Sequence, residues 1–101
     1  MAFGLFLAIS PFAKAQNLIL NGNFSSGTNN FTSDYVYVTG ANSATPEGTY
    51  SVVTKANDVH NAWGGYFDHT SGNSSGKYFI ANASSDTTKT VWQSNLLNVA
   101  Q

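Results

Sequence analysis

The sequence contains no cysteine and no arginine, and only four lysines and five acidic residues stand among its 101 residues. Without cysteine, disulfides, zinc-thiolate sites and thiol catalysis are excluded. The formal net charge is −1 and no basic cluster is present, so the chain lacks the electrostatic footprint of a nucleic-acid-binding protein. We therefore expect neither DNA nor RNA as a partner.

A long hydrophobic run is also missing, since a transmembrane helix needs about 20 apolar residues. The shorter run AFGLFLAI, at residues 2–9, is followed by a proline and then by the small-residue stretch AKA. This order is typical of a secretory signal peptide, although the usual positively charged start is absent. We expect a signal peptide over residues 1–15, cleavage before Gln16 and a secreted or cell-surface location for residues 16–101. A buried N-terminal helix is the alternative.

Helical periodicity is missing after Gln16, where short apolar or alternating runs recur instead. Such runs, separated by segments rich in Gly, Asn, Ser and Thr, indicate β-strands joined by turns. Aromatic residues make up 14% of the chain, which also suits strands. The predicted strands span residues 18–20, 35–38, 49–55, 63–67, 78–81 and 90–95, with 96–99 as a continuation.

Alternation within these strands assigns their side chains to the two faces of a sheet. Tyr35 and Tyr37 would share one face, and Val36 and Val38 would share the other. About six short strands at this spacing favour an all-β, antiparallel β-sandwich of the jelly-roll type, which has about eight strands. The sandwich would then be incomplete at the C-terminus, and its open strand edges and uncovered apolar faces would favour association.

The stretch NLILNGNFSSG, at residues 17–27, resembles the first strand of galactose-binding-like jelly-roll modules. Three further stretches resemble carbohydrate-binding modules of this kind at the front of secreted bacterial surface proteins: PEGTYSVV at 46–53, WGGYFDHTSGN at 63–73 and KTVWQSNLLNV at 89–99. Together they span nearly all of residues 17–99. The resemblance implies a jelly roll that binds glycans and of which this chain is the N-terminal portion.

The same resemblance bears on calcium. Family members often carry a carboxylate directly after the first-strand Phe, where it helps to hold a structural calcium ion. Here Ser25 follows Phe24, which departs from that pattern.

The stretch WGGYFDHTSGNSSGKYF, at residues 63–79, holds most of the candidate ligand site. Trp63, Tyr66 and the more distant Trp92 could form a platform for a sugar, together with the tyrosine pair Tyr35 and Tyr37, because flat rings contact the C–H faces of a pyranose. Asp68, with His69 beside it, would complete the ligand-binding set through hydrogen bonds to hydroxyls. The alternative for each ring is packing in the core.

The Asp68 and His69 pair also raises the question of catalysis, because an acid beside an imidazole can orient a base. Glycoside hydrolysis needs two carboxyl groups across the scissile bond, and Glu47, the only glutamate, lies in a predicted turn. No GxSxG elbow is present either. We therefore expect no enzymatic activity.

Metal binding is the other chemistry that this loop could support. A calcium ion prefers oxygen ligands, which Asp58, Asp68, Asn73 and loop carbonyls could supply. The structural alternative is a loop aspartate that accepts hydrogen bonds from backbone amides. Apart from such a structural calcium ion, no cofactor is expected.

The sequence thus predicts a non-catalytic carbohydrate-binding or adhesive module of a secreted or cell-surface bacterial protein. Its partner would be a polysaccharide or another glycan, and it would not insert into a membrane after signal cleavage. The alternative is a structural spacer or protein-interaction β-sandwich without a glycan ligand. The identity of the ligand and the oligomeric state stay open.

Overall fold

The computed structural model describes residues 18–95 of the chain. The predicted signal peptide, its cleavage site and the predicted strand at 96–99 lie outside the described residues. Over residues 18–95 the chain is all-β, with strands in two sheets and one short 3₁₀ turn, η3 (Ala56–Asp58). No helix within this range is long and apolar enough to cross a membrane.

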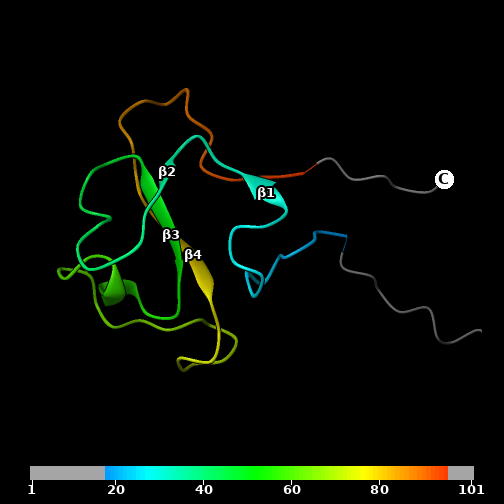
Figure 1. Cartoon of the computed structure of the whole chain (residues 1–101), viewed down its shortest axis with the longest axis vertical. Helices are drawn as coiled ribbons and strands as arrows, with labels where there is room; N and C mark the ends of the chain where they lie inside the picture. Colours follow the sequence, from blue (N-terminus) through cyan, green and yellow to red (C-terminus); the bar gives the residue numbers. More distant parts are fainter. Residues whose placement is uncertain (1–17, 96–101) are drawn as a thin grey trace, which may run out of the picture.

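The larger sheet has three strands in the order β2, β3, β4 (Figure 1). β2 (Val36–Tyr37) runs parallel to β3 (Thr49–Val53), and β3 pairs antiparallel with β4 (Tyr78–Asn82). The smaller sheet pairs β1 (Phe31–Thr32) antiparallel with β5 (Gln93–Ser94). β5 thus places residues 93–94 beside residues 31–32, more than 60 positions earlier in the chain.

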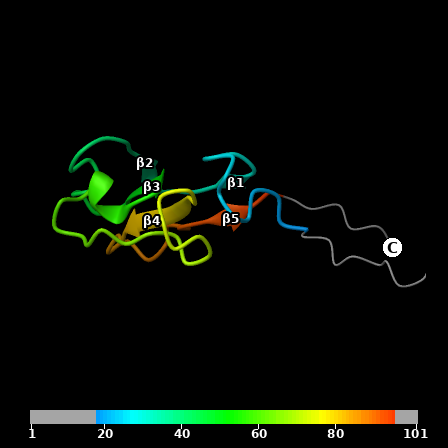
Figure 2. The same cartoon turned by 90° about the horizontal axis from the view of Figure 1, so that it is seen from below.

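Two apolar clusters cover the opposite faces of the larger sheet, because side chains alternate along β3 and β4. The aromatic cluster has a buried centre and a half-buried surround: Phe31, Tyr35 and Tyr50, with Phe24, Val52, Phe79, Ala81 and Trp92. The valine cluster is built in the same way: Ala44, Val53 and Val59, with Val38, Trp63, Tyr78 and Ile80. Figure 2 shows η3 on one side of the sheet and the smaller sheet on the other.

Register explains this division between the faces. Tyr50 lies opposite Ala81, and both belong to the aromatic cluster. Val53 lies opposite Tyr78, and both belong to the valine cluster. The predicted alternation is therefore confirmed in β3 and β4, although Val36 of β2 stays 61% exposed.

A β-bulge at Gly48 immediately precedes β3. The Gly48 N–H donates to the Asn82 carbonyl at 2.8 Å, while the next residue, Thr49, is the register partner of Asn82. Two residues of one strand therefore oppose a single residue of the other. Gly48 has a φ of +76°, which a glycine adopts without steric cost. The Asn82 side chain also donates to the carbonyls of Ala44 (3.0 Å) and Thr45 (2.9 Å), so the preceding loop is held to the end of β4.

Four predicted strands are confirmed in shorter or slightly shifted form. β2, β3 and β5 lie within the predicted ranges 35–38, 49–55 and 90–95, and β4 extends the predicted range 78–81 by one residue. The sequence missed β1 and η3, which lie outside every predicted strand.

The predicted strands at 18–20 and 63–67 are wrong. Residues 18–20 lead into a turn in which the Gly22 N–H donates to the Ile19 carbonyl at 3.3 Å, and Asn21 has a φ of +54°. In residues 63–67, the Tyr66 ring folds back over Gly64, where a Cβ atom would lie 2.5 Å from a ring carbon. An apolar run forms a strand only when a partner strand is in reach, and both segments lack one in the described structure.

Candidate functional site

The structure does not bring Trp63, Tyr66 and Trp92, three of the rings predicted to form a platform, onto one surface. Trp63 stacks on His60, with ring centroids 4.5 Å apart, and packs against the valine cluster. Trp92 packs against the aromatic cluster on the opposite face of the larger sheet, 6.2 Å from the Phe31 ring. Tyr66 is 72% exposed. The two tryptophans therefore do not share one surface.

Asp68 and His69 lie in the loop before β4. The Asp68 carboxylate accepts from the Ser71 N–H at 2.9 Å, and the Asp68 carbonyl accepts from the Gly72 N–H at 2.8 Å. This is the loop arrangement that the structural alternative for Asp68 predicts. His69 is exposed. Within residues 18–95, no group of three or more His, Asp or Glu side chains gathers in the way that a metal site would need.

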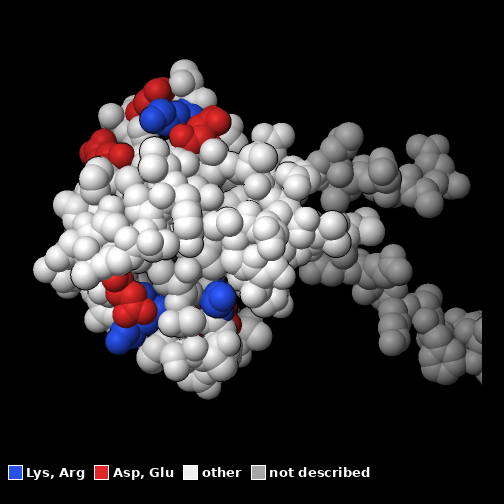
Figure 3. Space-filling model, viewed as in Figure 1, with Lys and Arg blue, Asp and Glu red and all other residues white. Residues whose placement is uncertain are grey.

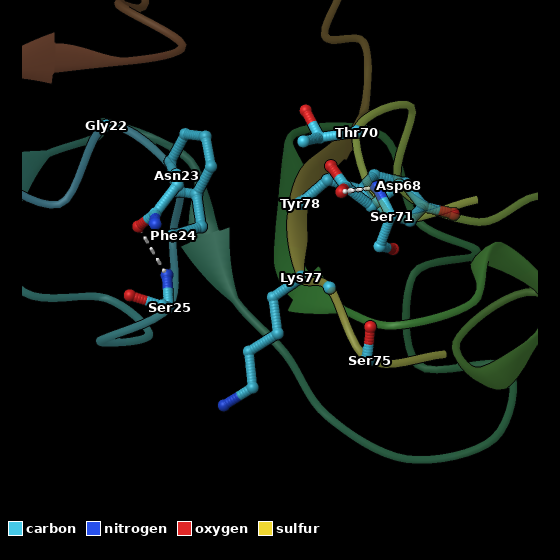
Figure 4. Close-up of a pocket in the computed structure, with 11 residues that line it drawn as sticks. Gly22, Asn23, Phe24, Ser25, Asp68, Thr70, Ser71, Ser75, Lys77 and Tyr78 are labelled. Carbon is cyan, nitrogen blue, oxygen red and sulfur yellow. Dashed lines mark hydrogen bonds between the residues drawn. The ribbon is translucent and has the colours of Figure 1, made fainter. Parts of the chain in front are cut away.

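Asp68 lines a groove of about 530 Å³ between two segments that are far apart in the sequence. One wall is the turn at residues 22–25, and the other is the loop at residues 68–77 with the first residue of β4 (Figure 4). The residues that line it are mostly small and polar: Gly22, Asn23, Phe24, Ser25, Asp68, Thr70, Ser71, Ser75, Gly76, Lys77 and Tyr78.

The first wall is organised by the side chain of Asn21. Its amide nitrogen donates to the carbonyls of Gly27 (2.9 Å) and Asn29 (2.8 Å), and its amide oxygen accepts from the Ser26 N–H (2.8 Å). These bonds join Asn21 to backbone groups five to eight residues later and so hold the turn in shape without pairing to another strand. The Phe24 ring then fastens the turn to the aromatic cluster, where it lies 5.8 Å from Phe31.

The second wall is closed by a glycine. At Gly76 a Cβ atom would lie 2.6 Å from the Asp68 carboxylate and 2.7 Å from the Ser71 hydroxyl, so no larger residue fits without displacing them. The Ser75 N–H donates to the Asn73 side chain at 2.8 Å within the same loop. Where the loop enters β4, the Tyr78 hydroxyl donates to the Tyr66 carbonyl at 2.6 Å.

The groove offers hydrogen-bonding groups with little charge. Asn23 supplies an amide, Ser25 and Thr70 supply hydroxyls, and Lys77 supplies an ammonium group that forms no ion pair with any described residue. In Figure 4, Asn23 and Ser25 lie across the groove from Thr70. Figure 3 shows that charged side chains occupy only a few small groups on an otherwise uncharged face of the molecule.

Trp92 lines a second hollow, of about 440 Å³, beside the Phe24 turn. This hollow is more apolar and shares Gly22, Asn23 and Phe24 with the groove. The Trp92 indole N–H is buried and has no hydrogen-bond partner among residues 18–95. Of the predicted ligand-binding residues, the groove thus contains Asp68, the second hollow contains Trp92, and neither contains Trp63, Tyr66 or His69.

Sequence reasoning missed the groove residues on the 22–25 turn and most of those on the 68–77 loop. Both segments are rich in Asn, Ser and Gly, a signal that indicated turns but not that the two turns face each other. No protein-family model, no curated protein and no solved structure matches this chain.

Proposed function

We propose that the protein is a non-catalytic carbohydrate-binding or adhesive module, with the groove between the 22–25 turn and the 68–77 loop as its glycan site. The groove itself is the observation that carries the proposal. It combines neutral hydroxyl and amide groups with the Phe24 and Tyr78 rings in one hollow. Sugar hydroxyls need such donors and acceptors, and the C–H faces of a sugar ring pack on aromatic side chains.

The size of the groove supports a small glycan segment. A volume of about 530 Å³ lies within the usual range for ligand pockets, roughly 300–1,000 Å³. Binding without catalysis is supported by the carboxylates: among the described residues that line the groove, Asp68 carries the only one. Hydrolysis of a glycosidic bond needs two carboxyl groups, and the Asp68 carboxylate already accepts the Ser71 amide.

The family, architecture and location belong to the same proposal. The NLILNGNFSSG stretch supports a galactose-binding-like jelly-roll module of a bacterial surface protein, and the apolar run at residues 2–9 supports secretion. The two described sheets are compatible with part of such a sandwich.

Retention on immobilised polysaccharides and glycan arrays tests the proposal. We expect Thr70→Ala and Lys77→Ala to weaken binding, because each removes a hydrogen-bonding group that lines the groove. The loss of one such bond corresponds to about 1 kcal/mol, or roughly a fivefold weaker affinity.

Two matched controls lie outside the groove. Thr87→Ala and Lys89→Ala remove the same groups from the exposed turn after β4 and should leave binding unchanged. The groove is not the glycan site if all four variants bind alike, and the carbohydrate proposal fails if no glycan retains the unmodified protein.

One observation favours the alternative of a structural or protein-interaction domain. Trp63 and Trp92, the largest rings in the chain, pack against clusters instead of standing free at the surface. A protein that binds no glycan but folds cooperatively would support this alternative.

A further inference from the structure

The direction of the backbone groups in β3 can be read from its bonds to β2. The carbonyls of Gly48 and Tyr50 accept from the N–H groups of Val36 (2.9 Å) and Val38 (2.8 Å). Because backbone groups alternate in direction along a strand, residues 49, 51 and 53 direct theirs toward β4.

The same alternation leaves the outer edge of β4 open. Residues 49, 51 and 53 are the register partners of Asn82, Ile80 and Tyr78, so these three residues of β4 face β3. The N–H and C=O groups of Phe79 and Ala81 therefore point away from the sheet. None of these four groups has a hydrogen-bond partner in the described part of the chain.

Nothing in the strand protects this edge. Open edges are usually blocked by charged residues, proline or bulges, or are covered by a loop. β4 reads YFIAN and contains no charge, no proline and no glycine. The neighbouring 22–25 turn forms its described hydrogen bonds with residues near it in sequence and none with β4. For example, the Phe24 N–H donates to the Asn21 carbonyl at 3.0 Å. Figure 2 shows β4 at one edge of the larger sheet and β2 at the other.

We propose that β4 pairs antiparallel with β4 of a second copy of this chain, with Ile80 on the two-fold axis. In this register Phe79 lies opposite Ala81 of the second copy, and Ala81 opposite its Phe79. Both are hydrogen-bonded pairs of the antiparallel ladder, so all four outward groups of each copy find partners. The dimer then contains one continuous sheet with three strands from each copy.

Side chains and charges fit this symmetric register. The large Phe79 ring meets the small Ala81 of the second copy on one face, and the two half-buried Ile80 side chains meet on the other. The nearest charge is Lys77, just before the strand. The two Lys77 residues lie six positions apart along the paired strands, about 20 Å, which exceeds a Debye length of about 8–10 Å. Like-charge repulsion therefore does not oppose the pairing.

Sedimentation equilibrium on the full chain, over a range of concentrations, tests the proposal. We expect a monomer–dimer equilibrium for the unmodified protein, weakened at least about tenfold by Ala81→Pro. Proline removes the outward N–H of Ala81 without touching the bonds to β3, because that N–H does not face β3. The matched control is Ala41→Pro, in an exposed turn closed by the Ser43 N–H and the Gly40 carbonyl at 3.2 Å. Proline is favoured at this turn position.

A cysteine experiment tests the register itself, since the chain contains no cysteine. In the proposed dimer the two Ile80 residues form a non-hydrogen-bonded pair with Cα atoms about 4.5 Å apart, within disulfide range. Mild oxidation should therefore cross-link Ile80→Cys but not Val36→Cys, which lies on the opposite edge strand. A monomer at every concentration, equal dimerisation of Ala81→Pro and the unmodified chain, or cross-linking through position 36 alone would each overturn the proposal.

Discussion

At the scale of single residues, Tyr50 shows how burial changes a side chain's chemistry. Desolvation by burial raises the pKa of Tyr50 above its ordinary value of 10.0, and electrostatic repulsion from the nearby Tyr37 hydroxyl raises it by a smaller amount. In the unfolded chain the same group ionises near its ordinary pKa. Between the two pKa values the unfolded chain therefore releases its proton first, and the free energy of unfolding falls as the pH rises.

We therefore predict that the protein loses stability as the pH rises above about 10. Tyr50→Phe should reduce this alkaline loss, and part of it should remain because burial also raises the pKa of Tyr78. Urea unfolding at about pH 8 and about pH 11 measures the effect. Tyr66→Phe, at an exposed ring, is the control. An alkaline loss of equal size in Tyr50→Phe would contradict the prediction.

Gly76 is tightly packed, so the effect of a larger side chain at this position can be predicted. Because a Cβ at this position would lie 2.6 Å from the Asp68 carboxylate, Gly76→Ala should displace that carboxylate from the Ser71 amide. We expect a loss of about 1 kcal/mol in the free energy of unfolding, measured by urea titration. At Gly65 a Cβ would meet its nearest neighbour at 3.5 Å, so Gly65→Ala should stay within about 0.5 kcal/mol. Equal effects of the two substitutions would show that the Gly76 contact is not tight.

At the scale of elements, the bulge at Gly48 sets where β3 begins and how it faces β4. Its φ of +76° is costly for residues with a Cβ, although a Cβ there would not clash, since it would lie 3.7 Å from the nearest atom, an ordinary van der Waals contact. Gly48→Ala should therefore destabilise the protein by about 1–2 kcal/mol through backbone strain alone. Gly48→Asn should cost less, because asparagine tolerates this conformation. Thermal unfolding of the two variants distinguishes strain from crowding. Backbone strain predicts that Gly48→Ala is the less stable variant, whereas crowding predicts that Gly48→Asn is, because asparagine is larger.

Elements were predictable from the sequence where a strand has partners on both sides or carries strong alternation. β3 combines both, and its residues Tyr50 and Val53 lie on the faces that alternation assigns. Residues 18–20 show the same kind of apolar run, but no strand of the described range 18–95 pairs with them, and they form no strand. β1 has only two residues, and its existence depends on β5, more than 60 positions later.

The candidate groove was beyond sequence reasoning for the same reason. Asn23 and Thr70 each stand in a segment that correctly indicated a turn. Their approach depends on the Phe24 ring packing against Phe31 and Phe79, a set of contacts between distant parts of the chain. Composition and spacing describe each turn but not which two turns meet.

At the scale of the whole molecule, the two clusters share one sheet. The aromatic cluster contacts Tyr50 and Phe79, and the valine cluster contacts Val53 and Tyr78 on the opposite face of the same two strands. Separation of β3 from β4 would therefore remove packing on both faces at once. We therefore expect the two clusters to unfold as one cooperative unit, although no described side chain belongs to both.

The two tryptophans allow a direct test of this coupling, because Trp92 reports on the aromatic cluster and Trp63 on the valine cluster. We predict that Trp63→Phe and Trp92→Phe, each with one remaining indole, keep fluorescence transitions that coincide with the circular dichroism transition of the same variant. Adding Phe31→Ala, which removes a buried ring from the aromatic cluster only, should cost about 3–5 kcal/mol. In a coupled molecule this substitution lowers the urea midpoint reported by Trp63 as much as the one reported by Trp92. If the Trp63 midpoint stayed in place while the Trp92 midpoint fell, the two faces of the sheet would unfold independently.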